Sequence, residues 1–235
     1  MNILSTNDDG WDCEGIKSLC SVLRDAGHRV VVMAPDKNRS GASHSITMAN
    51  SLVLIKVVEN DVWLCSGTPA DCVLSVCSGA IDFMPDIVVS GINAGCNLGT
   101  DVVFSGTAGA ARQGALSGLP SIAFSQDEFC GRGTFFADAA VWVKNNLGDL
   151  LKLWTKDFFI NVNFPGTNNF SPVYEKTFLS RRKYFDHCKA VQKDDGWMHL
   201  EFEGPNIITE SIPGSDDNAI KRNKISVSIV RVQPE

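Results

Sequence analysis

The first 35 residues constrain the fold most, because an apolar segment, a helical repeat and a second apolar segment follow one another without a break. Ile3-Leu4 open a short buried strand. Apolar residues then recur at i, i+3, i+4 and i+7, the spacing of one helix face: Ile16, Leu19, Cys20 and Leu23. Residues 29–35 form a continuous apolar run that ends at Pro35, as a buried parallel strand does. The pattern predicts a βαβ unit and hence a parallel sheet covered by helices.

The same alternation continues along the chain as far as Pro165. Strands are expected at about 52–58, 62–66, 86–90, 121–125 and 158–164, and helices at about 68–81, 108–117 and 136–148. We therefore predict a three-layer α/β/α Rossmann-like core over residues 1–165. Residues 166–235 hold more turn residues and charges, with strands expected at 197–202 and 224–230. We expect this segment to be an extended β-rich arm of the same domain, used in oligomerisation.

Composition excludes several classes of protein. The chain has 235 residues, of which 44% are hydrophobic, enough for the core of one domain. A net charge of −6 argues against a general nucleic-acid polymer as partner. No apolar run approaches the ~20 residues that span a bilayer, so no membrane partner is expected. The eight cysteines form no CxxC motif and the N-terminus shows no signal-peptide pattern, which favours reduced thiols and a cytoplasmic location.

Two adjacent acids end the first strand, in the sequence Asn7-Asp8-Asp9-Gly10. Open α/β sheets bind ligands at the carboxyl ends of their strands. No Lys or Arg precedes Lys17, so a cation is the simplest partner for both acids, and oxygen ligands favour Mg²⁺, Mn²⁺ or Ca²⁺ over Zn²⁺. The same four residues also suit an ordinary Asx turn before a helix. This motif alone leaves both interpretations open.

Three further stretches follow predicted strands and would meet at the same edge of the sheet. Residues 39–45 and 90–97 are rich in Ser, Gly and Asn, and Ser105-Gly106-Thr107 opens a helix, where free N–H groups attract anions. Each is weak alone, since a Ser/Gly segment is usually a plain loop and Thr107 could simply cap the helix. A GxxxxGKS/T motif and an early GxGxxG motif are both absent, which disfavours a P-loop kinase and a dinucleotide fold.

Several motifs in this order resemble the stationary-phase survival protein SurE family, whose members are 5′-nucleotidases acting on nucleoside monophosphates. They are ILSTNDDG at residues 3–10, APDKNRSGASHSIT at 34–47, GTPADCV at 67–73 and VSGINAG at 89–95, continued by SGT at 105–107. The resemblance is strong over residues 1–125, thinner to 165 and faint beyond. The chain departs from the family pattern at Cys96, where Pro is usual, at Gln113, where Glu is usual, and in lacking a C-terminal helix after the last strand.

The resemblance implies a role for eight residues. One divalent cation, Mg²⁺ or Mn²⁺, would be held by Asp8, Asp9, Ser40 and Asn93. The phosphate of a nucleoside monophosphate would meet Asn97, Ser105, Gly106 and Thr107. The resemblance also implies a homodimer or homotetramer in which the C-terminal arm is exchanged.

The function predicted from the sequence is that of a phosphoric monoester hydrolase, a metal-dependent 5′-nucleotidase. The cation would orient a water in line with the phosphate, and Asp8 or Asp9 would accept its proton. A covalent aspartyl-phosphate is the less favoured route. Two alternatives stand beside this prediction. One is a nucleotide- or metal-binding regulatory module that has lost catalysis, and the other is a sugar-nucleotide-dependent transferase that uses Asp8 and Asp9 on a diphosphate-bound metal.

Overall fold

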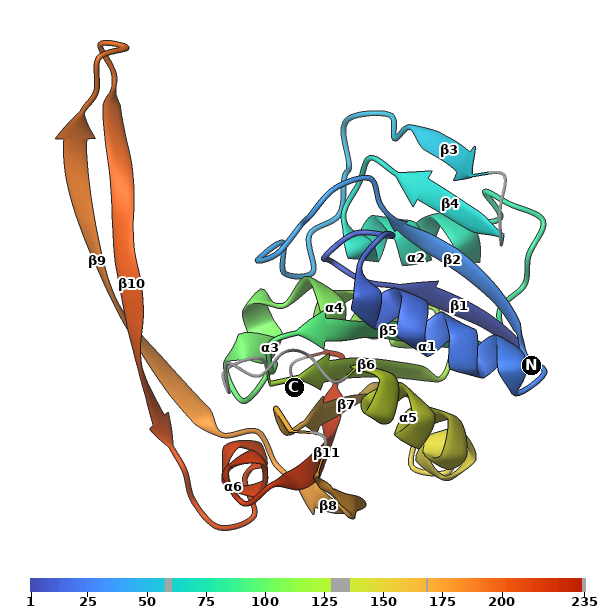
Figure 1. The fold of residues 1–235 in the computed structure, drawn as a ribbon. Coiled ribbons are helices and arrows are strands. Elements are labelled where there is room, and N and C mark those ends of the chain that lie inside the picture. Colours follow the sequence, from blue (N-terminus) through green and yellow to red (C-terminus); the bar gives the residue numbers. More distant parts are fainter. Residues whose placement is uncertain (58–60, 128–135, 168, 234–235) are drawn as a thin grey trace.

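The chain folds around one nine-stranded, mostly parallel sheet (Figure 1). The computed structural model describes residues 1–57, 61–127, 136–167 and 169–233. The sheet contains β1 (Asn2–Thr6), β2 (Arg29–Pro35), β3 (Leu54–Val57), β4 (Val62–Cys65), β5 (Ile87–Ala94), β6 (Ser121–Gln126), β7 (Phe158–Phe164), β8 (Ser171–Thr177) and β11 (Lys224–Arg231). Their spatial order is β3-β4-β2-β1-β5-β6-β7-β11-β8. β3 and β4 are antiparallel, and residues 58–60 between them lie outside the described ranges.

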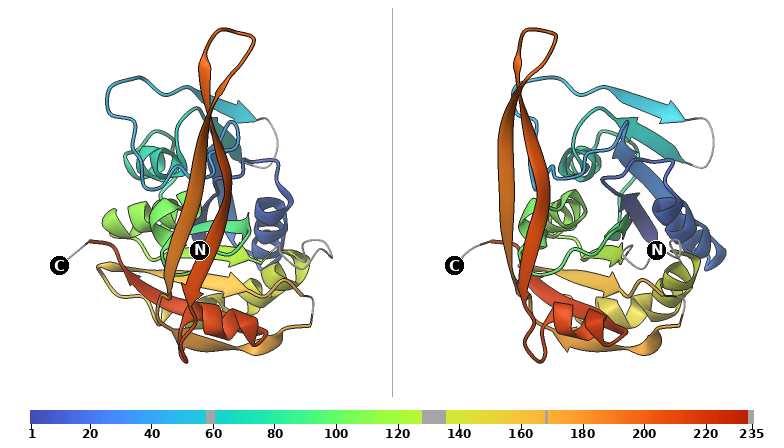
Figure 2. Two further views of the ribbon diagram at one scale, coloured as in Figure 1. Left: turned by 90° about the vertical axis from the view of Figure 1, so that its left-hand side faces the viewer. Right: turned by 60° about the vertical axis from the view of Figure 1, so that its left-hand side comes forward.

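Helices cover both faces of this sheet. They are α1 (Glu14–Asp25), α2 (Pro69–Cys77), α3 (Asp101–Phe104), α4 (Gly106–Leu116), α5 (Phe136–Leu151) and α6 (Asp216–Lys221). Adjacent residues of β1 serve opposite faces: Ile3 packs with α1 and α5, and Leu4 packs with α2. α4 lies beside α2 on the second face (Figure 2). The three-layer α/β/α prediction is confirmed. Among the described residues, none of the helices is both long enough and apolar enough to cross a bilayer.

The central strands place a switch point at the end of β1. The chain passes from β1 to β2 on one side, and β5 later pairs with β1 on the other, both in parallel. Loops leaving the carboxyl ends of β1 and β5 therefore diverge, and ligands of open α/β sheets bind in that crevice. β5 runs four residues beyond the expected 86–90 segment, to Ala94, with a register shift against β6 between Ser90 and Asn93.

The projecting part of the chain is shorter than residues 166–235. β9 (Arg181–Gln192) and β10 (Met198–Glu210) pair only with each other, antiparallel, and form a long hairpin beside the body (Figures 1 and 2). We call this hairpin the arm. β8 and β11 lie in the same C-terminal segment but join the main sheet, where β11 pairs antiparallel with β7 and parallel with β8. The final strand thus completes the body and only residues 181–210 leave it.

Candidate active site

A tight turn at the end of β1 presents the two acids. The Asn7 side chain closes it from both sides: Nδ2 donates to the Gly10 carbonyl at 2.7 Å, and Oδ1 accepts from the Gly10 N–H at 3.2 Å. Gly10 has φ +110°, a conformation that glycine adopts without strain. Asp8 and Asp9 therefore lie in a turn, and the extended geometry that sends adjacent side chains to opposite faces of a strand does not apply to them. Asn7 acts here as a turn former.

Asp8 is a buried carboxylate held by the start of α4. It is 4% exposed, and its Oδ1 accepts a 2.5 Å hydrogen bond from the Thr107 hydroxyl. A side chain at Gly106 would place its Cβ 2.8 Å from the Asp8 Cβ, so glycine is what lets the helix approach this closely. Burial raises the pKa of Asp8, and the Thr107 hydrogen bond opposes that rise. A bound cation would favour the ionised form, so this environment fits a metal ligand.

The loop that carries Ser40 is tied to Asp8 and to α3. The Arg39 N–H donates to the Asp8 carbonyl at 2.7 Å. The Ser43 N–H donates to the Phe104 carbonyl at 2.9 Å, and its hydroxyl donates to the Val103 carbonyl at 2.6 Å. These contacts hold Ser40 at the end of β2, beside the end of β1.

Asn93 lies near the end of β5, and Asp9 contacts the same end of that strand. Asn93 uses its Nδ2 to donate to the Gly95 carbonyl at 2.8 Å, which leaves Oδ1 as the atom available for a ligand. Asp9 Oδ2 accepts from the Ala94 N–H at 3.4 Å. The second acid is thereby drawn toward β5, the strand that delivers Asn93.

Asn97 is held from below by the sheet. Its N–H donates to Asn163 Oδ1 at 2.8 Å, and its carbonyl accepts from Asn161 Nδ2 at 2.9 Å and from Asn163 Nδ2 at 3.2 Å. Its side-chain Nδ2 donates to Ser125 Oγ at 2.8 Å. Both the backbone and the side chain of Asn97 are therefore fixed by β6 and β7.

Ser105 caps α4. Its Oγ accepts from the Ala108 N–H at 3.0 Å, so the hydroxyl proton remains for donation to a ligand. The N-terminus of α4 also presents the positive end of the helix dipole, while the N–H groups of Gly106 and Thr107 bond to the Asp8 carboxylate. The Ser105 hydroxyl and the helix dipole are the features of this helix end that favour an anion.

One cavity of about 1000 Å³ brings most of the predicted residues together. Five of them line it: Asp8, Ser40, Asn93, Asn97 and Ser105. Asp9, Gly106 and Thr107 lie beside Asp8 and are not among the lining residues. Thr107 is fully buried with its hydroxyl on Asp8. Its observed contact is thus with the carboxylate, whereas the resemblance assigned it to the phosphate.

The donors available at this edge are oxygens. Within residues 1–57, 61–127, 136–167 and 169–233 there is no cluster of three or more His, Cys, Asp or Glu side chains arranged for a metal. The set at the switch point is two carboxylates with the neutral oxygens of Ser40 and Asn93. Such a set, completed by water, suits Mg²⁺ or Mn²⁺.

Sequence reasoning missed the residues that hold the site together. Asn161 and Asn163 alternate in an otherwise apolar strand, a polar pattern in a buried segment that could have indicated them. The arm also contributes to the cavity wall, through Arg182, Tyr184 and Ile207.

Fold and site together define an α/β protein with a cavity lined by side-chain oxygens beside a helix N-terminus, at the switch point of a parallel sheet. A family model described as "Survival protein SurE" matches residues 3–186. A 5′-nucleotidase SurE of Stenotrophomonas maltophilia is 41% identical over 99% of this chain and 90% of its own length. One of Treponema pallidum is 46% identical over 69% of this chain and 89% of its own length. The chain belongs to the SurE family.

The fold of a solved relative agrees with this assignment. The crystal structure of the SurE protein from Aquifex aeolicus superimposes with a TM-score of 0.83 at 31% identity, covering all of this chain and 95% of that one. The resemblance inferred from the motifs is thus confirmed for the family and for the fold.

Proposed function

We propose that this chain is a metal-dependent 5′-nucleotidase that hydrolyses nucleoside monophosphates to nucleoside and phosphate. The observation that carries the proposal is the convergence of Asp8, Ser40, Asn93, Asn97 and Ser105 on one cavity. These residues come from the ends of three different strands and from the segments that follow them, and they would pair cation ligands with anion donors. The names of the relatives from Stenotrophomonas and Treponema, both 5′-nucleotidases, support the same substrate class.

Asp8, Asp9, Ser40 and Asn93 would hold the cation, Mg²⁺ or Mn²⁺. When bound, it supplies Lewis-acid activation of water and neutralisation of phosphate charge. The protein groups do the rest. Thr107 keeps the Asp8 carboxylate turned toward the cavity, and one of the two acids accepts the proton of the attacking water.

The phosphate would lie against the start of α4. The Ser105 hydroxyl would donate to its oxygens as charge develops, and Asn97 would fix its orientation from the sheet side, while the Gly106 and Thr107 N–H groups hold Asp8. Because these donors are already anchored, they need little reorganisation at the moment of reaction.

The arm supports the further proposal of a homodimer or homotetramer. Large apolar side chains stand exposed along it, among them Trp197, Leu200, Phe202 and Ile208. The strands that carry them pair only with each other in one chain. A second copy of the chain would cover this surface, and sedimentation of the wild-type protein against Leu200→Lys tests it: the variant should sediment as a smaller species.

We also propose a cytoplasmic location, which the free cysteine thiols support. The seven cysteines that the structure describes are all free, as is usual where glutathione keeps thiols reduced. Cys130 lies outside the described residues.

A substrate and metal panel tests the activity. Nucleoside 5′- and 3′-monophosphates and sugar nucleotides are assayed for product release with Mg²⁺, Mn²⁺ or Zn²⁺, with and without EDTA. We expect phosphate release from 5′-monophosphates that EDTA abolishes and Mg²⁺ or Mn²⁺ restores. Binding without turnover would instead favour a regulatory module, and preferential sugar-nucleotide cleavage would favour a transferase.

A further inference from the structure

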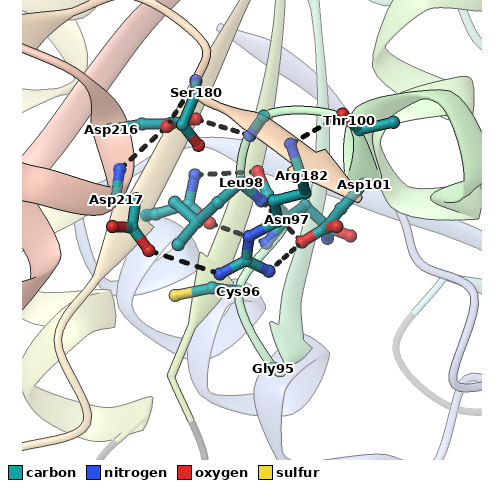
Figure 3. Close-up of polar contacts among 12 residues, drawn as sticks. Gly95, Cys96, Asn97, Leu98, Thr100, Asp101, Ser180, Arg182, Asp216 and Asp217 are labelled. Atoms are coloured by element: carbon teal, nitrogen blue, oxygen red, sulfur yellow. Dashed lines mark hydrogen bonds and ion pairs between the residues drawn. The ribbon is translucent and has the colours of Figure 1, made fainter. Parts of the chain in front are cut away.

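A buried polar cluster joins residues 180–182, which we call the arm root, to the site (Figure 3). Residues 95–105, which we call the 95–105 loop, run from β5 to α4 and carry Asn97 and Ser105. The cluster that packs on this loop comes from sequence far downstream: Ser180, Arg182, Asp216 and Asp217. None of these four has a role in the chemistry described above.

Asp216 links the loop to the arm root through backbone N–H groups. Its Oδ2 accepts from Gly99 at 2.7 Å, and its Oδ1 accepts from Ser180 and from Asp217, each at 2.8 Å. The residue is fully buried. Three N–H donors on one carboxylate are how a protein stabilises a charge that water cannot reach.

Arg182 adds a second attachment one residue into β9. Its N–H donates to Thr100 Oγ1 at 3.0 Å. Its guanidinium is ion-paired with Asp101 and lies 3.7 Å from Asp217 Oδ1. Asp101 Oδ2 in turn accepts from the Leu98 N–H at 3.1 Å, so the pair also fixes the loop backbone. The side chain of Arg182 is 16% exposed, unlike the solvent-exposed ion pairs that contribute little.

The loop is thereby held from two sides. Asn161 and Asn163 of the sheet hydrogen-bond to Asn97, and the cluster at the arm root holds residues 98–101. Gly99 lies so near the arm root that a Cβ there would be 2.1 Å from the Ser180 carbonyl oxygen. The stretch between these contacts and α4 ends at Ser105, the predicted phosphate donor.

We propose that Arg182 and Asp216 are positioning residues that fasten the 95–105 loop to the arm root, so that the seating of the arm sets the geometry of Asn97 and Ser105. The catalytic part of this inference rests on the proposed function. A displacement of the arm, as when a second copy binds it, then changes turnover without any contact between that copy and the phosphate.

The experiment compares Arg182→Gln with Arg181→Gln. The two neighbours lose the same charge, but Arg181 is exposed and has no part in the cluster. We expect Arg182→Gln to lower kcat by about 10- to 100-fold with KM changed less than about threefold, because small misplacement of preorganised groups affects mainly the transition state. Arg182→Lys should recover part of the loss, and Arg181→Gln should match the wild type.

Hydrogen exchange gives a readout that does not depend on turnover. The N–H groups of Leu98 and Gly99 bond to Asp101 and Asp216, so we expect their exchange to accelerate at least about tenfold in Arg182→Gln, while α1 stays as protected as in the wild type. Thr100→Val, which removes the acceptor for the Arg182 N–H, should give a smaller change of the same kind and serves if Arg182→Gln does not fold.

Two outcomes would overturn the proposal: unchanged exchange at residues 97–101, or faster exchange there with unchanged kcat. A wild-type protein that releases no phosphate from any nucleotide would instead count against the proposed function. The exchange data would then decide alone whether Arg182 holds the loop.

Discussion

The body and the arm both contain large apolar side chains, but the body buries them and the arm leaves them exposed. In the body, Leu19 and Leu23 of α1 are fully buried against the sheet. In the arm, Leu200 and Phe202 are 67% and 72% exposed on a hairpin that pairs only with itself. A strand pair in isolation is marginal in water. The body therefore buries its large apolar side chains within one chain, whereas those of the arm lie exposed on a hairpin that pairs only with itself.

Polar groups follow the same division. At the cavity, Asp8, Asn97 and Ser105 each bond to a neighbour that is itself anchored. Toward the arm tip, beyond Arg182, ion pairs such as Lys193 with Glu201 are half exposed, and such pairs contribute about 0–1 kcal/mol. Preorganised chemistry therefore belongs to the body. Changes in the body should affect activity and stability, and changes at the arm tip should affect assembly.

The largest effect is expected from Asp8→Asn. The change removes one proposed charged metal ligand and keeps the shape of the side chain, so we expect kcat to fall by about 10³-fold or more, since a metal ion supplies several kcal/mol of charge stabilisation. Added Mn²⁺ should raise the melting temperature of the wild type and not that of the variant, because binding to the folded state stabilises it. Phosphate release and thermal melts check both. If the Asp8→Asn variant turned over substrate at the wild-type rate, the assignment of Asp8 as a metal ligand would be wrong.

A matched pair of leucines tests the comparison itself. Leu19→Ala deletes a fully buried side chain and should cost about 2–5 kcal/mol of unfolding free energy. Leu200→Ala, at the arm, should change the unfolding free energy of the monomer by less than about 0.5 kcal/mol. Denaturant unfolding at low protein concentration measures both. Equal losses at the two positions would mean that the arm folds as part of the body.

The sequence predicts the strands of the body better than it predicts the arm. Buried parallel strands are mostly apolar runs, so the sequence predicts the segments at residues 29–35 and 121–125, and a family motif at residues 34–47 indicates the loop after the first of them. β9 begins Arg-Arg-Lys-Tyr and contains Asp-His, with no apolar run to indicate a twelve-residue strand. The role of β11 was also missed, because joining β7 depends on a pairing some 65 residues away in sequence.

Within the site, side-chain types were predictable and their partners were not. Two acids beside Ser and Asn suggested cation ligands, and the structure brings Asp8, Ser40 and Asn93 to one cavity. Their assignment as metal ligands stays a prediction. The Thr107 bond to Asp8 joins residues 99 apart, and the Asp216 bond to Gly99 joins residues 117 apart. Such contacts depend on how the layers pack, which local patterns do not record.

A smaller effect than that of Asp8→Asn, and the most informative about preorganisation, is expected from Thr107→Val. The substitution keeps the shape of the buried side chain and removes the hydroxyl that donates to Asp8 Oδ1 at 2.5 Å. If Thr107 acts by holding Asp8, the affinity for Mn²⁺ should fall by about 10- to 100-fold, the usual effect of losing a partner of a metal ligand. Thr107→Ser keeps the hydroxyl and should retain most of that affinity. Titration calorimetry with Mn²⁺ alone separates this role from a direct contact with phosphate: unchanged Mn²⁺ affinity with weaker inhibition by inorganic phosphate would return Thr107 to the phosphate site.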